Sequence, residues 1–189
     1  MATRLFVLLF CLFMLLNSRE PPWADAHLAY ATAESIVDRH AVDVTLDAPA
    51  YFFAVRDGKK YGYAMLGNAL SLVPSYAAYK ALRKLHVFPE QPLYALTSHL
   101  SSALLMAGAV SIFFTLCRRR GESPRTALLL SLTLALCTIC FIYARSPYGE
   151  ALQTFGMMFL LERTLAQAQR MTRAGMAGLG LAEIGRAHV

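Results

Sequence analysis

Four predominantly apolar stretches lie along this chain, at residues 5–16, 93–116, 126–144 and 151–163, with charged segments between them. A transmembrane helix needs about 20 apolar residues, and residues 93–116 would cover roughly 36 Å at the helical rise. The stretch at 5–16 is short and also has the shape of a signal-peptide core. Because no small-residue cleavage site follows it closely, we favour a first membrane helix over a cleaved signal peptide.

Residues 17–92 form one long polar segment that contains most of the acidic residues of the chain. Its apolar positions predict two amphipathic helices, at residues 24–39 and 63–85, which would lie along a membrane surface. Between these helices the pattern indicates irregular or extended chain with a turn at Asp57-Gly58. Basic residues nearly balance the acidic ones, so the segment is not a polybasic lipid-binding patch.

The charges between the apolar stretches predict an orientation. The loop after residue 116 is strongly basic, and cytoplasmic loops carry an excess of lysine and arginine. Its arginines are Arg118, Arg119, Arg120 and Arg125. The amino terminus and this loop would then be inside, with residues 17–92 and the turn near 145–150 outside. We therefore expect an all-α, multi-pass integral membrane protein of about four spans, with a large outer loop that carries the two amphipathic helices.

Composition supports this class. Hydrophobic residues make up 57% of the chain and charged residues 16%, whereas soluble domains contain about 25% charged residues. The net charge of +6 would suit nucleic-acid binding, but no basic stripe interleaved with exposed aromatics is present. We expect membrane lipids as partners and no nucleic acid. The Cys137-x-x-Cys140 pair lies in an apolar stretch and is interpreted as two small apolar residues rather than a redox or zinc site.

Polar residues at the edges of the apolar stretches are candidates for chemistry. Asp25, near the start of the helix predicted at 24–39, would either cap that helix or act as a general base. Residues 56–63 combine cations and tyrosines beside a turn, which can hold a phosphate or can be a solvated turn. Arg145 and Glu150 flank an outer turn, and they would either pair with each other or contribute to a site.

Together these features resemble the amino-terminal part of GT-C fold glycosyltransferases, membrane enzymes that use lipid-phosphate-linked sugars. Family 39 protein mannosyltransferases and bacterial aminoarabinose transferases belong to this group. The resembling segments are AHLAYATAESIVDRHAVDV, DGKKYGYAMLGNALSLVPSYA and YARSPYGEALQTFGMMFLLER. Within them, residues 58–61 match a G-(R/K)-x-Y turn, residues 72–74 match Leu-x-Pro, and residues 146–150 match an S-x-x-G/S-E step.

The resemblance implies transfer of a sugar from a lipid-phosphate carrier to an acceptor on the outer face of a bacterial inner (plasma) membrane. Asp25 would be the catalytic base that deprotonates or orients the acceptor hydroxyl. The residues implied for binding the carrier phosphate are Lys59, Lys60 and Arg145. The residues implied as support are His27, Tyr61 and Glu150. Many relatives have Asp-Glu where this chain has Asp25-Ala26, so the resemblance leaves a divalent metal cofactor open.

Two further expectations concern the extent and the class of the protein. Residues 183–189 match the translation of a common sequencing adapter, so we expect residues 1–182 to be an amino-terminal fragment of a longer protein and inactive alone. The alternative function is a non-enzymatic polytopic membrane protein, such as a transport or assembly subunit. Transporters place ionisable sites near the bilayer midplane, and the predicted spans contain no such charge in their interiors, so the enzyme is favoured.

Overall fold

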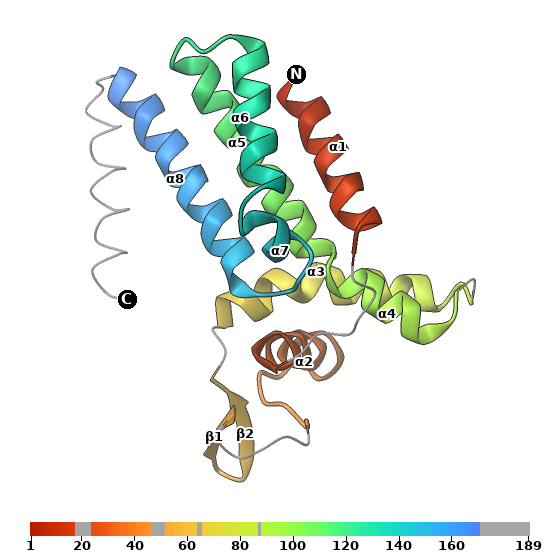
Figure 1. Ribbon diagram of the computed structural model, residues 1–189. Coiled ribbons are helices and arrows are strands. Elements are labelled where there is room, and N and C mark those ends of the chain that lie inside the picture. The colour runs from red at the N-terminus through yellow and green to blue at the C-terminus, as the bar shows by residue number, and fades with distance from the viewer. Residues whose placement is uncertain (18–23, 47–51, 64–65, 87, 171–189) are drawn as a thin grey trace.

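The computed structural model of the 189-residue chain describes residues 1–17, 24–46, 52–63, 66–86 and 88–170. This part of the chain is mostly helical, with one two-stranded antiparallel hairpin. The helices are α1 (Ala2–Leu15), α2 (Ala24–Arg39), α3 (Leu66–Arg83), α4 (Glu90–Ser98), α5 (Leu100–Arg119), α6 (Pro124–Leu136), α7 (Cys140–Ala144) and α8 (Gly149–Arg170). Figure 1 shows α1, α5, α6 and α8 as an upright bundle, with α3, α4, α2 and the hairpin in successive layers beneath it.

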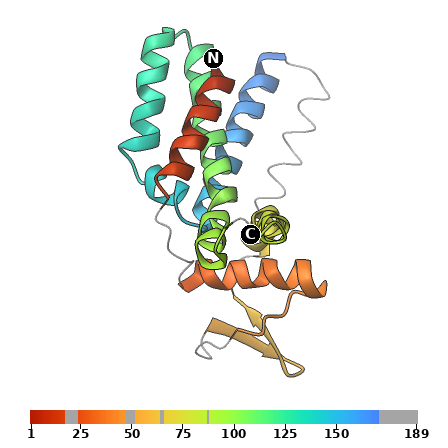
Figure 2. The same cartoon turned by 90° about the vertical axis from the view of Figure 1, so that its right-hand side faces the viewer.

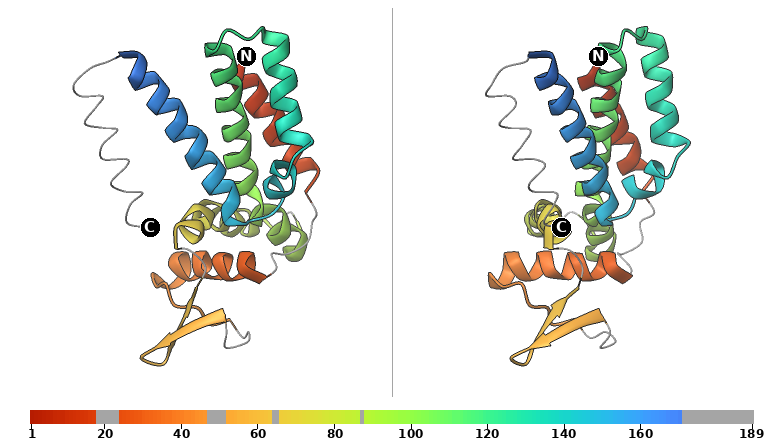
Figure 3. Two further views of the ribbon diagram at one scale, coloured as in Figure 1. Left: turned by 60° about the vertical axis from the view of Figure 1, so that its left-hand side comes forward. Right: turned by 90° about the vertical axis from the view of Figure 1, so that its left-hand side faces the viewer.

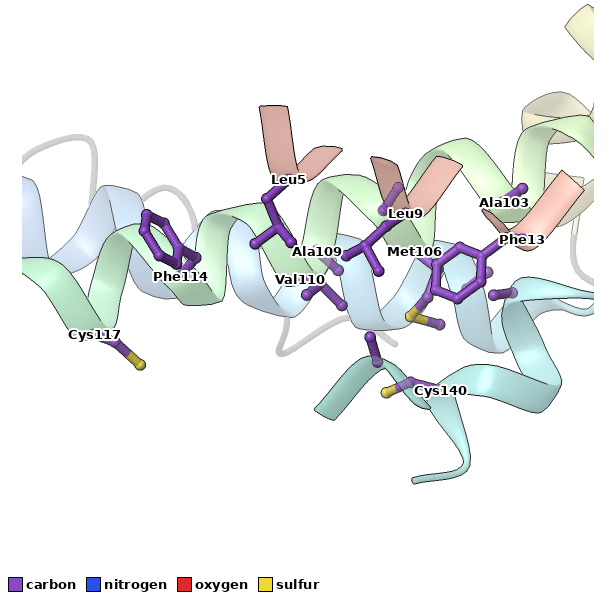
Figure 4. Close-up of a cluster of buried hydrophobic side chains, with 14 of the residues drawn as sticks. Leu5, Leu9, Phe13, Ala103, Met106, Ala109, Val110, Phe114, Cys117 and Cys140 are labelled. Atoms are coloured by element: carbon purple, nitrogen blue, oxygen red, sulfur yellow. The ribbon is translucent and has the colours of Figure 1, made fainter. Parts of the chain in front are cut away.

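Helix α5 forms the centre of the bundle, and α1, α6 and α8 pack around it. Leu5, Leu9 and Phe13 of α1 are buried at a spacing of four residues, which places them on one face of that helix. Figure 4 shows these three side chains directed at α5, where Met106 and Val110 are fully buried. Small residues elsewhere on α5 allow the neighbouring helices to approach its backbone closely.

The outward faces of the bundle are also apolar. Large hydrophobic side chains are exposed on α1, α6 and α8, among them Val7, Leu8, Leu129, Leu130, Met157 and Leu161. Soluble monomers rarely expose contiguous apolar surface of this kind. Figure 2 shows the chain's amino end, the turn between α5 and α6 and the last turn of α8 at the same end of the bundle.

The four predicted spans are not supported as such. Within the part of the chain that the structure describes, one helix is long and apolar enough to cross a membrane, Glu90–Arg119, which comprises α4 and α5 with His99 between them. It contains the span predicted at 93–116. Helices α1 and α6 are apolar but shorter. The stretch predicted at 126–144 is broken at residues 137–139, where α6 ends before α7 begins.

The two helices predicted in the polar segment are confirmed. Helix α2 has the predicted bounds, and α3 lies inside the range predicted at 63–85. They pack on each other through a second core that includes Ala33, Leu72 and a group of tyrosines. Tyr30 makes edge-to-face ring contacts with Tyr76 and Tyr94, with centroids 5.9 and 5.1 Å away. Aromatic pairs in this geometry stabilise beyond their buried area.

The mostly helical structure is consistent with the all-α expectation, to which it adds one small hairpin. Strand β1 (Phe53–Arg56) pairs with β2 (Lys59–Gly62) in an antiparallel register that sets Arg56 opposite Lys59. The two turn residues, Asp57 and Gly58, both have positive φ angles, of 52° and 73°. That is the requirement of a type I′ turn, so the predicted Asp57-Gly58 turn is confirmed. The flanking segments are only four residues each, too short for periodicity to predict strands.

Candidate functional site

A pocket of about 190 Å³ lies where the first turns of α2, α3 and α8 meet. Its lining consists of Asp25, Tyr63, Asn68, Tyr148, Gly149, Glu150 and Gln153. The first turn of a helix leaves backbone N–H groups unpaired and carries partial positive charge. Asp25 and Glu150 each lie in such a turn, so both carboxylates are placed beside unpaired backbone N–H groups at a helix start.

Asp25 is held by a tyrosine from the end of the hairpin. The Tyr63 hydroxyl donates a hydrogen bond to Asp25 Oδ1 over 2.5 Å. The Tyr63 ring stacks on Phe52, with centroids 6.1 Å apart and an interplanar angle of 7°. Asp25 is the second residue of α2 and therefore belongs to the first turn itself rather than to the N-cap position. The Asp25 carboxylate is thus oriented by the Tyr63 hydroxyl, and the Tyr63 ring is in turn held against Phe52.

Asn68 connects the start of α3 to the start of α8. Its side-chain nitrogen donates to the Pro147 carbonyl over 3.4 Å, and it is buried. A Cβ atom on Gly149 would lie 3.6 Å from Asn68 Cβ, so the two backbones are already close there. The Tyr148 ring meets the Tyr143 ring edge-to-face, with centroids 6.4 Å apart. These contacts fix the backbone from which Glu150 projects.

The composition of the lining determines which ligands it suits. Two carboxylates, two phenols and two side-chain amides supply hydrogen-bond donors and acceptors for hydroxyl or amino groups. No lysine or arginine is among the lining residues. An ionised carboxylate can accept a proton from a hydroxyl that binds within hydrogen-bond reach. The pocket is thus suited to a polyhydroxylated ligand and to general-base chemistry, and it lacks its own cation for a phosphate.

The predicted phosphate-binding lysines lie outside this pocket. Lys59 and Lys60 belong to β2, where Lys59 is paired with Arg56 across the hairpin. The Lys60 ammonium lies over the Phe53 ring, 5.4 Å from its centroid. Figure 3 shows the hairpin on the far side of α2 from the bundle in both views. The structure therefore does not bring these lysines to the Asp25 pocket, and their role stays a prediction.

Arg145 follows α7, a few residues before the pocket residue Glu150. Its guanidinium lies over the Phe141 ring, 5.0 Å from the centroid. Its Nε atom is buried and makes no hydrogen bond within the described residues. Among those residues, no ion pair joins Arg145 to Glu150, so the alternative in which they pair with each other is not supported. Arg145 does not line the pocket.

The predicted supporting residues His27 and Tyr61 also lie outside the lining. Residues two positions apart on a helix do not face each other, so His27 and Asp25 point to different sides of α2. Burial lowers the pKa of His27, which favours the neutral imidazole. Tyr61 is paired with Ala54 within the hairpin. Of the three supporting residues named from sequence, only Glu150 shares a pocket with Asp25.

Five lining residues were not assigned from sequence: Tyr63, Asn68, Tyr148, Gly149 and Gln153. Helix spacing could have identified Gln153 as a site residue, because it lies three positions after Glu150 and so shares the same helix face. Asn68 is a polar residue near the start of a helix, where asparagine is often a capping residue, so its sequence position alone does not indicate a site. Nothing in the local sequence distinguishes Tyr63 from Tyr61 as the partner of Asp25. That choice depends on how the hairpin docks.

Two observations bear on cofactors and relatives. Across the described residues, no group of three or more histidine, cysteine, aspartate or glutamate side chains is arranged to hold a metal ion. Mg²⁺ and Ca²⁺ prefer carboxylate oxygens, but the pocket lining contains only two carboxylate side chains, Asp25 and Glu150. No protein-family model, curated protein or solved structure matches this chain. Its function is therefore inferred from the pocket and its setting.

Proposed function

We propose that this chain is part of a membrane glycosyltransferase of the GT-C type, which moves a sugar from a lipid-phosphate carrier to an acceptor on the outer face of a bacterial inner membrane. The observation that supports this function is the pocket shared by Asp25 and Glu150. These two residues are far apart in the sequence: Asp25 immediately precedes the first segment of the resemblance, and Glu150 lies in the third. A pocket of hydrogen-bonding side chains and a positioned carboxylate is what sugar transfer to a hydroxyl requires.

A multi-pass membrane setting is part of the proposal. In it, α5, the part of the Glu90–Arg119 segment that lies within the bundle, crosses the bilayer, and α1, α6 with α7, and α8 complete the embedded bundle. The apolar side chains exposed on α1, α6 and α8 support this setting, because lipid would cover them. The turn between α5 and α6, which arginines at the adjoining ends of both helices flank, lies at the end of the bundle that holds the amino terminus (Figure 1). The Asp25 pocket lies at the opposite end of α8, which becomes the outer side.

The proposed reaction uses Asp25 as the base. The acceptor hydroxyl oxygen attacks the anomeric carbon of the bound sugar while the bond from that carbon to the carrier phosphate oxygen breaks. The proton passes from the hydroxyl to Asp25, and the phosphate leaves with the bonding electron pair. Tyr63 keeps the Asp25 carboxylate aimed at the hydroxyl, and Glu150 binds sugar hydroxyls. Arg145, or the Lys59-Lys60 turn, would offset the charge that develops on the phosphate.

Sugar transfer by the full-length protein in proteoliposomes tests the assignment, with a radiolabelled polyprenyl-phosphate sugar as donor. Asp25→Asn removes the base and should lower the transfer rate by about 10²- to 10⁴-fold. The matched control is Asp57→Asn, the same chemical change at a carboxylate whose side chain is 89% exposed in the hairpin turn. Asparagine tolerates the positive φ of that turn, so transfer should stay within twofold of wild type.

Two results would overturn the proposal. Equal transfer rates for wild type and Asp25→Asn would remove Asp25 from the reaction. A wild-type protein that neither binds nor turns over any polyprenyl-phosphate sugar would favour the non-enzymatic alternative, a transport or assembly subunit. Donor binding measured on the same proteoliposomes distinguishes loss of the base from loss of donor recognition. Asp25→Asn should leave donor affinity within about twofold while it lowers the turnover rate.

A further inference from the structure

The three consecutive arginines at the end of α5 differ in their surroundings. The Arg118 guanidinium donates to the Glu122 carbonyl oxygen. Arg119 forms an ion pair with Glu162 of α8, with an N–O distance of 2.6 Å. The backbone N–H of Arg120 caps α5 by donating to the Leu116 and Cys117 carbonyl oxygens, but its guanidinium makes no hydrogen bond or ion pair to any residue that the structure describes. The positive-inside rule counts the three arginines equally. In the fold they differ, because only the Arg120 guanidinium lacks a partner among the described residues.

Arg120 lines a pocket of about 310 Å³ between the last turn of α5 and the second half of α8. The other lining residues are Leu116, Arg119, Leu165 and Ala168. One side of the pocket is therefore cationic and the rest is apolar. Glu162 is paired with the other lining arginine, Arg119, and no acid is among the lining residues, so the charge that Arg120 adds is not cancelled there.

This combination of surfaces is suited to an amphiphile with an anionic head. A guanidinium binds phosphate oxygens through two parallel N–H donors and is weakly hydrated, which favours phosphate contacts at an interface. The leucines beside it would contact the upper part of an acyl chain. A free phosphate ion would gain nothing from the apolar walls. Basic pockets between membrane helices on the cytoplasmic side are typical sites for acidic lipid headgroups.

The position of the pocket along the bundle agrees with this ligand. Its lining residues belong to the last turn of α5 and the second half of α8. Figure 1 shows these helix ends at the end of the bundle where α5 turns into α6. The helices next to it expose apolar side chains, so in a bilayer the boundary between hydrocarbon and headgroups would fall near this turn. A phosphodiester at that depth would reach Arg120 without leaving the interface.

We propose that the pocket around Arg120 binds the phosphate of an anionic membrane phospholipid, with the acyl chains directed along the apolar walls toward the bundle. The site is separate from the Asp25 pocket. It requires that the chain resides in a membrane but does not require glycosyltransferase activity. Its role would be to hold the cytoplasmic ends of α5 and α8 together at the interface, alongside the Arg119–Glu162 ion pair.

Lipid binding to the purified full-length protein tests this site. The protein is exchanged into mild detergent, and native mass spectrometry measures retained phosphatidylglycerol against phosphatidylcholine of the same acyl chains. Wild type should bind phosphatidylglycerol at least about tenfold more tightly, and Arg120→Gln should lower that affinity by about tenfold. The matched control is Arg125→Gln, an exposed arginine of the same basic region that does not line the pocket. Its affinity should stay within twofold of wild type.

A second variant tests the apolar wall and does not rely on the arginine. Ala168 is exposed on α8, so Ala168→Phe should fold normally while its ring occupies the pocket, and phosphatidylglycerol affinity should again drop by about tenfold. Equal losses from the two arginine variants would mean diffuse surface electrostatics and would overturn the proposal. So would equal binding of the two lipids, or inorganic phosphate that competes as strongly as phosphatidylglycerol. Because donor turnover is not measured, failure here leaves the glycosyltransferase assignment untouched.

Discussion

Replacing Gly108 by alanine tests how closely α5 and α8 are packed. A Cβ atom at this position would lie 2.9 Å from Phe155 Cε2 and 3.1 Å from Phe155 Cδ2. Non-bonded carbon atoms prefer separations of about 3.5–4.0 Å, so the Phe155 ring or the α8 backbone would have to move. Gly156, one position along α8, offers the matched control, because a Cβ there meets nothing within 4 Å.

The two substitutions should change the free energy of unfolding in opposite directions. Alanine in a helix interior is favoured over glycine by about 1 kcal/mol, and Gly156→Ala should gain roughly this amount. Gly108→Ala has the same intrinsic gain but adds the overpacking strain, typically about 1–3 kcal/mol. The strain is therefore the difference between the variants. For a chain of this size, 1 kcal/mol shifts Tm by about 2–4 °C, so the two apparent Tm values should differ by roughly 2–12 °C.

The assay is thermal unfolding of the purified protein in one detergent, followed by the loss of helical circular dichroism. Repeating the Gly108→Ala change in a Phe155→Leu background removes the ring edge that the new methyl group meets. In that background the alanine should become neutral or stabilising, as expected for a direct pairwise contact. If Gly108→Ala is as benign as Gly156→Ala, or if its cost persists with Phe155→Leu, the close α5–α8 contact described above is wrong.

Three further outcomes follow from the outer layers. Gly62→Ala would place a Cβ 2.6 Å from Leu28 Cγ, so the hairpin should dock poorly on α2, and limited proteolysis should cut it faster; unchanged cleavage would contradict this. Tyr63→Phe removes the donor to Asp25 and should lower sugar transfer by about tenfold, the value of one hydrogen bond to a charged group, whereas Tyr61→Phe should have no effect. Burial raises the pKa of Glu34 above its usual 4.5, so its contribution to stability is present below pH 4.5 and is lost as the pH rises through the folded-state value. Glu34→Gln, neutral throughout, should therefore match wild type in acid and exceed its Tm increasingly above pH 4.5; parallel Tm curves would refute this.

The sequence predicted correctly those elements that depend on residues only a few positions apart. Helix α2 was predicted at its observed bounds because apolar residues recur on one face over several turns. The Asp57-Gly58 turn was predicted because these two residue types adopt positive φ readily. The apolar stretch at 93–116 is long enough to predict helix from local pattern alone, and it lies inside Glu90–Arg119, although the fold divides it between α4 and α5 at His99.

Errors arose where composition was uniform but the backbone was not. Residues 126–144 are apolar and contain no proline or glycine, so the sequence predicted one continuous helix. The fold instead ends α6 at Leu136 and begins α7 at Cys140. The short α7 packs on α5 and presents Cys140 and Ala144 to the bundle core. Helix propensity is a weak preference that tertiary packing can override. In residues 126–144 no single residue fixes the helix across positions 137–139.

The amino-acid sequence alone determined a composition typical of membrane proteins, the amphipathic helices of the polar segment and the asymmetric distribution of charge. It also identified Asp25 and Glu150 as candidate site residues. Only the tertiary structure decided that these two carboxylates share a pocket, that Tyr63 rather than Tyr61 binds Asp25, and that Lys59 and Lys60 lie elsewhere. The physical reason is the range of the interactions. Helix periodicity and turn preference act between residues a few positions apart, whereas the pocket is formed by the starts of α2, α3 and α8, which meet only once the chain has packed.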